Sequence, residues 1–369
     1  MIAEAGTYCR HFGDICRNPK RLIGWRAVLA SFLGHSANSP ARYARSMKNT
    51  ASQFLSPTQI RHLSQTSNWS GVRGVGHQWL WIIASFTLVT LIPNPITVIF
   101  AVVVIGTRQL GLAIAQHDGA HRSLARSAWL NTWLGQWLSA APVAQDMERY
   151  RIHHLRHHGH TGTERDPDQR LADGFPITKP SMRRKFLRDI SGLTGLKTLI
   201  GSLLMLAGLY RYDVSGGPLE KATRDARLGQ RLVIAIRGLA PFIVMNTLIW
   251  LALAVFASGW VYLLWVAGLL FVYPWVLRVR SMAEHALTPD YDDALNNSRT
   301  TYGKFWEKAL YAPLNVNYHL EHHMLSNVPY NRMPEMHQML IEAGAFEHSH
   351  CVEQTYGDVM AKVTAKHAA

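Results

Sequence analysis

Histidine is concentrated in three short stretches of this sequence, HDGAH (117–121), HHLRHH (153–158) and HLEHH (319–323). In the first stretch two imidazoles stand four residues apart. In the other two they stand at i, i+3 and i+4, a spacing that gathers side chains on one face of a helix. The eight residues in this pattern are His117, His121, His154, His157, His158, His319, His322 and His323.

Imidazoles gathered in this way indicate metal binding, because cationic rings repel one another whereas neutral rings offer lone pairs. A structural zinc closes with four ligands and often includes cysteine. The three cysteines, Cys9, Cys16 and Cys351, all lie outside the histidine stretches. All-imidazole ligation suits Zn, Cu, Fe or Ni. Since eight histidines exceed the need of one ion, we expect two ions, and redox-active iron fits best.

Other interpretations of the histidines are weaker. Packed structural histidines or a metal-storage tract would not repeat one spacing in distant stretches on one predicted side of a membrane. A metal transporter or sensor is a remote alternative. It would hold histidines within membrane spans near the bilayer midplane, whereas here they follow the spans.

Four apolar segments precede or follow the histidine stretches and are long enough, with interfacial help, to cross a bilayer core of ~30 Å. The expected spans are about 79–92, 96–116, 239–257 and 260–277. They form two hairpins, since PNP (93–95) and SG (258–259) are short turns. Arg108 and Gln109 are the strongly polar interruptions of the second span.

Two further apolar stretches, 129–144 and 196–210, are expected to be interfacial or half-buried helices. Trp129, Trp133 and Trp137 recur every four residues and form one aromatic face, either a membrane anchor or part of an apolar substrate tunnel. A fifth span at 196–210 would reverse the topology, so it is disfavoured.

The charge distribution predicts the orientation in the membrane. The chain has 38 Lys and Arg against 24 Asp and Glu, a net charge of +14. The two short turns carry no Lys or Arg, whereas the long segments between and after the hairpins carry many. The positive-inside rule therefore places both termini and the histidines in the cytoplasm. The positive charge is thus topological, and a nucleic-acid partner is excluded.

The resulting fold class is an all-α integral membrane protein, with four transmembrane helices in two hairpins and a cytosolic helical cap that carries the histidines. We expect a basic cytosolic extension over 1–76, with a short amphipathic helix near 21–34. The membrane domain should cover 77–345 and a C-terminal tail 346–369. Cysteine usage fits a reducing compartment, and the expected location is the inner (plasma) membrane of a bacterium.

The three stretches with paired spans between the second and the third resemble the membrane fatty acid desaturase superfamily over about residues 79–345. The superfamily includes acyl desaturases and acyl and carotenoid hydroxylases and ketolases. The resemblance implies a non-haem di-iron centre that uses O2 and two external electrons. It assigns the eight histidines as ligands, and His285, in RSMAEHA, stands where members often supply one more.

Polar residues near the histidines are expected to orient them, because a ligating imidazole usually donates its other N–H to a carboxylate or carbonyl. Asp118, Glu284 and Glu321 adjoin proposed ligands. The run TGTERDPD (161–168) resembles one that follows this box in relatives. The remaining candidates are Glu164, Asp166 and Asp168 in that run, and Asn317 before the third box.

The segment NYHLEHHMLSNVPYNRMPEMH (317–337) resembles the tail of bacterial acyl desaturases and favours formation of a double bond in a fatty acyl chain of a lipid. Hydroxylation or ketolation of a carotenoid or acyl lipid is the alternative. The substrate is expected to enter from the membrane. Electrons should come from a ferredoxin- or cytochrome b5-like donor, because the sequence carries neither a haem nor a ferredoxin motif.

Overall fold

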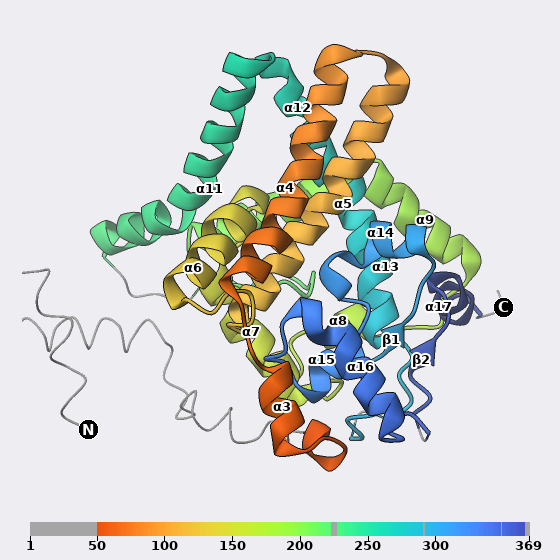
Figure 1. Cartoon of the computed structure of the whole chain (residues 1–369). Coiled ribbons are helices and arrows are strands. Elements are labelled where there is room, and N and C mark those ends of the chain that lie inside the picture. The colour runs from red at the N-terminus through yellow and green to blue at the C-terminus, as the bar shows by residue number, and fades with distance from the viewer. Residues whose placement is uncertain (1–49, 223–226, 291, 348, 366–369) are drawn as a thin grey trace, which may run out of the picture. The chain divides into compact units, whose positions relative to one another are not determined.

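The computed structural model describes residues 50–222, 227–290, 292–347 and 349–365, so the helix expected near 21–34 lies outside the described residues. Residues Met47–Ala369 form one compact unit. Its described part is mostly helical (Figure 1). Strands β1 (Thr300–Thr301) and β2 (Val352–Glu353) pair in parallel over two residues.

The described residues form a succession of helices along the chain. The α-helices are α3 (Pro57–Leu63), α4 (Asn68–Leu91), α5 (Pro95–Ala120), α6 (Ala128–Thr132), α7 (Met147–His160), α8 (Gln169–Ala172), α9 (Lys179–Ile190), α10 (Leu193–Leu206), α11 (Leu228–Phe256), α12 (Tyr262–Ala267), α13 (Tyr273–His285), α14 (Phe305–Tyr311), α15 (His319–Met324), α16 (Met333–Glu342) and α17 (Tyr356–Val363). The 3₁₀ turns are η1 (Thr50–Gln53), η3 (Ala141–Val143), η4 (Gly259–Val261), η6 (Pro313–Asn315) and η7 (Tyr330–Arg332), and η2 (Trp133–Ala140) and η5 (Gly268–Val272) are π-helical.

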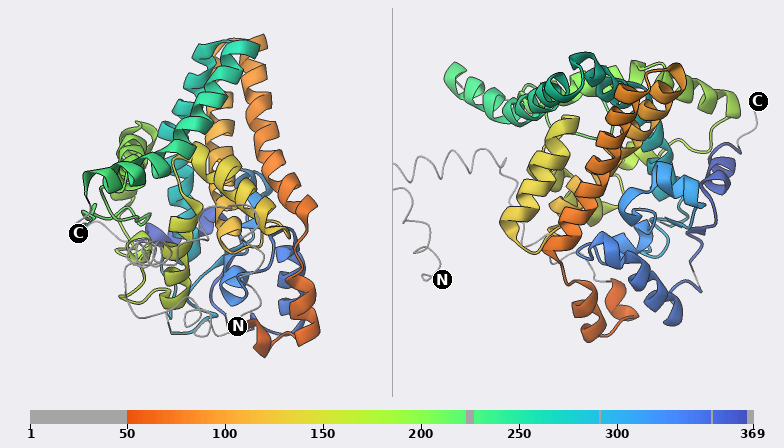
Figure 2. Two further views of the ribbon diagram at one scale, coloured as in Figure 1. Left: turned by 90° about the vertical axis from the view of Figure 1, so that its left-hand side faces the viewer. Right: turned by 45° about the horizontal axis from the view of Figure 1, so that its top comes forward.

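The four expected spans are found as four long apolar helices in the described residues, each longer than predicted: α4, α5, α11 and the run Gly259–His285. The short turn expected at residues 93–95 is found between α4 and α5. The Asn94 side chain accepts hydrogen bonds from the backbone N–H groups of Ile96 and Thr97, and Pro95 opens α5. Helices α4 and α5 then run side by side (Figures 1 and 2).

The main hydrophobic core lies where α5 packs against the run Gly259–His285. Ile105, Leu112, Trp265 and Val276 are fully or almost fully buried there. Gly106 is needed for this close approach, because a Cβ atom at that position would lie 2.5 Å from Val272 Cβ. The core thereby fixes the end of α5, which carries the first histidine stretch, against the helix that ends at His285.

The polar residues expected to interrupt the second span have partners inside the protein. The Arg108 guanidinium donates to the Ala309 carbonyl and, at 3.4 Å, to Gln78 Oε1. The Gln109 amide donates to the Trp265 carbonyl at 2.9 Å. Intramembrane polar groups are tolerated when they are satisfied in this way, so these residues bind neighbouring segments together and do not break the helix.

The two ambiguous stretches are helical but bent. Residues 129–144 form α6, η2 and η3, and Trp129 and Trp133 stack with ring centroids 6.2 Å apart at the surface, 71% and 41% exposed. These two tryptophans therefore do not line an internal tunnel. Helix α10 meets α9 at a 62° bend, and only if this bent pair counted as one span would there be a fifth.

The ends of the packed unit differ from the expected domain boundaries. Residue 76 lies inside α4, and residues before it already join a core, since Leu63 packs with Leu320 and Met336. At the other end, Val359 and Val363 of α17 are buried in the main core. Hydrophobic burial thus extends the unit beyond both predicted limits, 77 and 345.

A buried ion pair fastens α9 to α13. Asp189 is fully buried and accepts from Arg278 Nε at 2.6 Å and Nη2 at 2.9 Å. Because Arg278 retains some solvent contact, Asp189→Ala should lower the free energy of unfolding by about 3 kcal/mol, the lower end for a broken buried pair. Chemical denaturation in detergent measures this. Glu220→Ala, which breaks the exposed pair with Arg211, should change it by less than about 1 kcal/mol.

Candidate metal centre

Nine histidines converge in two neighbouring groups whose ligand nitrogens all lie within 4.8 Å of one another inside each group. Histidine group 1 contains His117, His121, His154, His158 and His322, and histidine group 2 contains His157, His285, His319 and His323. All nine predicted ligands are therefore brought together, and no predicted ligand is left outside.

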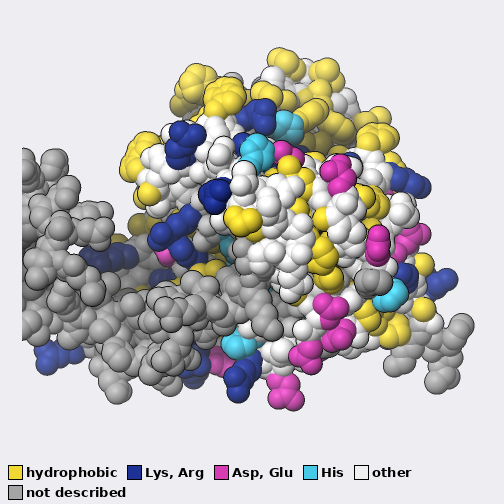
Figure 3. Space-filling view, turned by 60° about the horizontal axis from the view of Figure 1, so that its bottom comes forward, with side chains coloured by type: hydrophobic (Ala, Val, Ile, Leu, Met, Phe, Trp, Pro, Cys, Tyr) yellow, Lys and Arg dark blue, Asp and Glu magenta, His cyan; other side chains and the backbone are white. Residues whose placement is uncertain are grey.

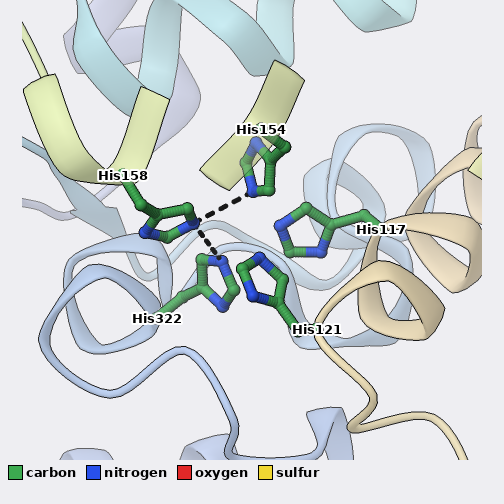
Figure 4. A group of neighbouring side chains, drawn as sticks. All are labelled: His117, His121, His154, His158 and His322. Atoms are coloured by element: carbon green, nitrogen blue, oxygen red, sulfur yellow. Dashed lines mark hydrogen bonds between the residues drawn. The ribbon is translucent and has the colours of Figure 1, made fainter. Parts of the chain in front are cut away.

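The i, i+3, i+4 spacing divides each of two histidine stretches between the groups. On α7, His154 and His158 point into group 1 and His157 into group 2. On α15, His322 joins group 1, whereas His319 and His323 join group 2. The end of α5 supplies two histidines to group 1 alone, and α13 ends on His285 in group 2. Figure 4 shows the five rings of group 1 converging from α5, α7 and α15.

In group 1 the Nε2 atoms face one another. His158 Nε2 lies 3.0 Å from His154 Nε2 and 3.1 Å from His322 Nε2. The Nε2 atoms of His117 and His121 are buried without a hydrogen-bond partner. A buried nitrogen without a partner is costly, so these atoms indicate a place for an ion.

Group 2 has the same construction. His285 Nε2 lies 2.8 Å from His319 Nε2 and 3.2 Å from His157 Nε2, and His323 Nε2 lies 3.1 Å from His319 Nε2. His285 Nδ1 donates to the Asn297 carbonyl at 3.2 Å. That bond places the ring proton on Nδ1 and leaves the Nε2 lone pair directed into the group.

Carboxylates lie behind three of the proposed ligands and accept a hydrogen bond from two of them, as expected for Asp118 and Asp166. His117 Nδ1 donates to Asp118 at 3.0 Å and His157 Nδ1 to Asp166 at 2.8 Å. Glu284 Oε1 lies 3.5 Å from His319 Nδ1.

Asp166 is itself held in place by backbone bonds. The N–H groups of Gly162 and Asp168 donate to it at 2.7 and 2.8 Å. The run after the second histidine stretch is therefore built around this carboxylate, which fixes the orientation of the His157 ring.

The other predicted supporting residues differ in place. Asp168 receives a 2.8 Å bond from His153 and lies 4.0 Å from His157 Nδ1. Glu164 is exposed, and none of the nine histidines is hydrogen-bonded to it. The Asn317 amide is buried, and neither its nitrogen nor its oxygen has a hydrogen-bond partner. Of the three carboxylates in the run 161–168, Glu164 is thus the one without a contact to a histidine.

Glu321 supports the third stretch through residues that the sequence did not connect with it. Its carboxylate accepts from the Thr300 hydroxyl and from His337 Nδ1, and His337 Nε2 lies 3.1 Å from the Tyr302 hydroxyl. Glu321 therefore ties α15 to β1 and α16 and does not bond a ligand. The contact between Glu321 and His337 could not be predicted from the sequence, because the two residues lie on separate short helices and no periodic pattern relates them.

The electrostatics of the groups suit binding of a cation. Burial, followed by the charges of neighbouring imidazoles, lowers the pKa of His154, His158 and His323 well below the ordinary value of 6.5. Burial would also lower the pKa of His157, but the hydrogen bond that its ring donates to Asp166 and the charges of the surrounding carboxylates raise it. Most of the rings are therefore neutral at pH 7, the form that binds a metal.

The donor set fits two metal ions. Two nitrogens each about 2.1 Å from one ion lie about 3 Å apart at a right angle, and the closest Nε2 pairs within each group are 2.8–3.2 Å apart. Five and four imidazoles are enough for two ions with a borderline preference for N donors.

Comparison with known proteins decides the family. A sequence profile of the fatty acid desaturase family matches residues 93–355, which is most of the chain and includes all nine histidines of the two groups. The chain belongs to the fatty acid desaturase family. The chain is also 28% identical to dihydrorhizobitoxine desaturase of Bradyrhizobium elkanii over 261 residues, which cover 68% of this chain and 69% of that protein.

The family assignment gives the two histidine groups a context. Membership of this family indicates an oxidoreductase, and the four long apolar helices of the chain agree with a membrane protein. Its histidine stretches, at the ends of α5 and α13 and on α7 and α15, are consistent with a metal site.

The hydrogen bond between Asp166 and His157 should matter for metal retention. Asp166→Asn removes the charge that fixes the His157 ring, so metal affinity should fall by about 10–100-fold, as for other supporting residues. Competition with a chelator, followed by metal analysis, measures this. Glu164→Gln in the same loop is the matched control, and an equal loss there would contradict the role given to Asp166.

Proposed function

We propose that the protein is an O2-dependent oxidoreductase that introduces a double bond into a fatty acyl chain of a lipid, using two irons held by histidine groups 1 and 2. The observation that carries this proposal is the convergence of nine imidazoles into two adjacent groups in a chain of the desaturase family. The irons would supply the redox chemistry that activates O2 toward an unactivated C–H bond.

The chain contributes ligation, orientation and exclusion of water. Eight rings come from three helices, and His285 completes the set. Asp118, Asp166 and Glu284 lie behind His117, His157 and His319 and direct their Nε2 atoms inward. Burial of most of these rings keeps solvent away from the reacting atoms.

The overall reaction balances with an external electron donor. The substrate loses two hydrogen atoms from neighbouring carbons, two electrons arrive from the donor with two protons, and O2 becomes two molecules of water. Rebound of oxygen to carbon would give a hydroxyl group in place of the double bond. The donor is proposed to be a ferredoxin- or cytochrome b5-like protein.

The proposed membrane placement puts both termini and the histidine groups on the cytoplasmic side of the inner membrane. Figure 3 views the protein from the side opposite the α4–α5 turn. Lys, Arg, Asp and Glu side chains lie on this face, and hydrophobic side chains gather at the top of the view. A charged face of this kind suits contact with a soluble electron donor.

The function is tested by lipid and pigment profiling of cells that express the chain, with His157→Ala as control. A new acyl double bond that the variant does not produce is the expected result. A new hydroxyl or keto group, on an acyl lipid or a carotenoid, would instead establish the alternative. Purified protein with labile zinc and no O2-dependent consumption of reductant would identify a metal transporter or sensor and refute the proposal.

A further inference from the structure

A buried arginine lies directly beside histidine group 2. Arg280 on α13 pairs through Nε with Glu284 Oε1 at 2.6 Å, and the same oxygen lies 3.5 Å from His319 Nδ1. The guanidinium is therefore only two contacts away from a proposed metal ligand. Both side chains are nearly enclosed, 12% and 9% exposed.

Two tyrosines lie within range of the charge of this arginine, and one of them packs against histidine group 1. The Tyr150 ring on α7 stacks on His154, with centroids 5.1 Å apart and planes 17° apart, and its edge faces His117 at 6.3 Å. Burial raises the pKa of Tyr150, and the nearby charge of Arg280 opposes that rise. Tyr273, at the start of α13, is also buried and lies within range of the Arg280 charge and of Tyr150.

Four polar atoms of these three side chains lack partners. In the part of the chain that the structure describes, no hydrogen bond or ion pair reaches the two terminal nitrogens of Arg280 or the hydroxyls of Tyr150 and Tyr273. The Nε atom of Arg280 is fully enclosed, but these four atoms are not. Polar groups in nearly buried side chains are normally satisfied, so their donors are available to a ligand.

The chemistry of these donors selects an anion. A guanidinium has five N–H donors in a planar fork. One edge is used by Glu284, and the terminal nitrogens can still hold two oxygens of a carboxylate or phosphate side by side. The nearby carboxylates do not occupy the terminal nitrogens, since Glu284 pairs with Arg280 through Nε and Asp168 accepts a hydrogen bond from His153. Metal ions in the two groups would add positive charge next to the same space.

We propose that Arg280, together with the hydroxyls of Tyr150 and Tyr273, binds an anionic group of the substrate, a carboxylate or a phosphate. The inference rests on the proposed function and narrows its substrate class. Because Arg280 is two contacts from His319 and Tyr150 touches His154, the oxidised C–H bond lies within a few bonds of the anionic group. A long chain anchored only by apolar contacts would not use these residues.

The test measures binding to the full-length, iron-loaded protein in nanodiscs, without turnover. The probes are octanoate, octyl phosphate and the neutral octanamide, each under anaerobic conditions. We expect one of the two anions to bind about 10–100-fold more tightly than octanamide, as for a charge-assisted pair of hydrogen bonds. Preference for octanoate identifies a carboxylate, and preference for octyl phosphate identifies a phosphate.

Three variants assign the preference to these residues. Arg280→Gln should remove the difference between anion and amide, and Tyr150→Phe or Tyr273→Phe, which each delete one hydroxyl, should weaken anion binding several-fold. Arg156→Gln, an exposed arginine on the same helix as Tyr150, is the matched control and should keep the full preference. Iron content of every variant is measured in parallel.

The outcomes separate a binding role from a positioning role. Equal binding of all three probes to the wild-type protein, or an anion preference that survives in Arg280→Gln, overturns the proposal. If Arg280→Gln fails to retain iron, the wild-type preference and the two tyrosine variants decide alone. An anion preference in a protein that yields no oxidised product in cells would refute the proposed function and leave the binding site standing.

Discussion

Under the proposed function, replacing His323 with alanine should reduce oxidation of the substrate by at least ~100-fold and release the iron proposed for histidine group 2. Mutation of a residue that only supports a ligand costs about 10–100-fold in metal affinity or activity. His323 itself supplies one of only four ligand nitrogens in that group. His121→Ala should do the same to group 1. Iron per chain after dialysis against a chelator should fall from two to about one in either variant, as measured by elemental analysis.

The double variant tests whether the two groups act as one unit. If both ions are needed together, His121→Ala with His323→Ala should lose no more activity than either single change, since residues that act as a unit are non-additive. His62→Ala is the control, because His62 is exposed and pairs with Glu335 on the surface. Full activity in either ligand variant would contradict the assignment of that group.

Removal of the metal should make the protein strongly sensitive to mild acid. Burial, and then neighbouring imidazole charge, lowers the pKa of five histidines outside the spans well below 6.5: His154, His158, His319, His322 and His323. Below pH 6.5 the unfolded chain binds these protons and the folded chain does not. As the pH falls below 6.5, each such histidine therefore lowers the free energy of unfolding by about 1.4 kcal/mol per pH unit.

His157 acts in the opposite direction, because its pKa is raised, but it is one residue against five. The melting temperature of chelator-treated protein should fall by more than about 5 °C between pH 7.5 and 5.5. The iron-loaded protein should melt higher at pH 7.5, since ligands that bind only the folded state stabilise it. A melting temperature that stays constant across this pH range would contradict neutral, buried imidazoles in the chelator-treated protein.

Much of the fold and the ligand set could be predicted because both follow local periodicities. Long apolar runs identified the four long helices, and imidazoles at i, i+3 and i+4 identified the proposed ligands. Asp166 could be predicted from its place just after a histidine stretch. These features depend on residues within a few turns of one another.

The features that sequence reasoning missed depend on contacts between distant segments. No local pattern connects Leu63 with Met336, or His337 with Glu321. The spacing of Arg280 and Glu284 at i, i+4 was visible, but it did not reveal that Tyr150 on another helix lies within range of the charge of the same arginine. Composition likewise did not reveal that residues before 77 and after 345 join the hydrophobic cores, because long-range burial brings them there.

The division of α7 and α15 between the two histidine groups has a mechanical consequence. Residues such as His154 and His157 are three positions apart, a rise of about 4.5 Å along a regular helix. The separation of the two groups is therefore built into the pitch of two helices and does not depend on loop geometry. Loops around the centre can open or close for substrate, but drawing the two groups apart would require α7 and α15 to unwind.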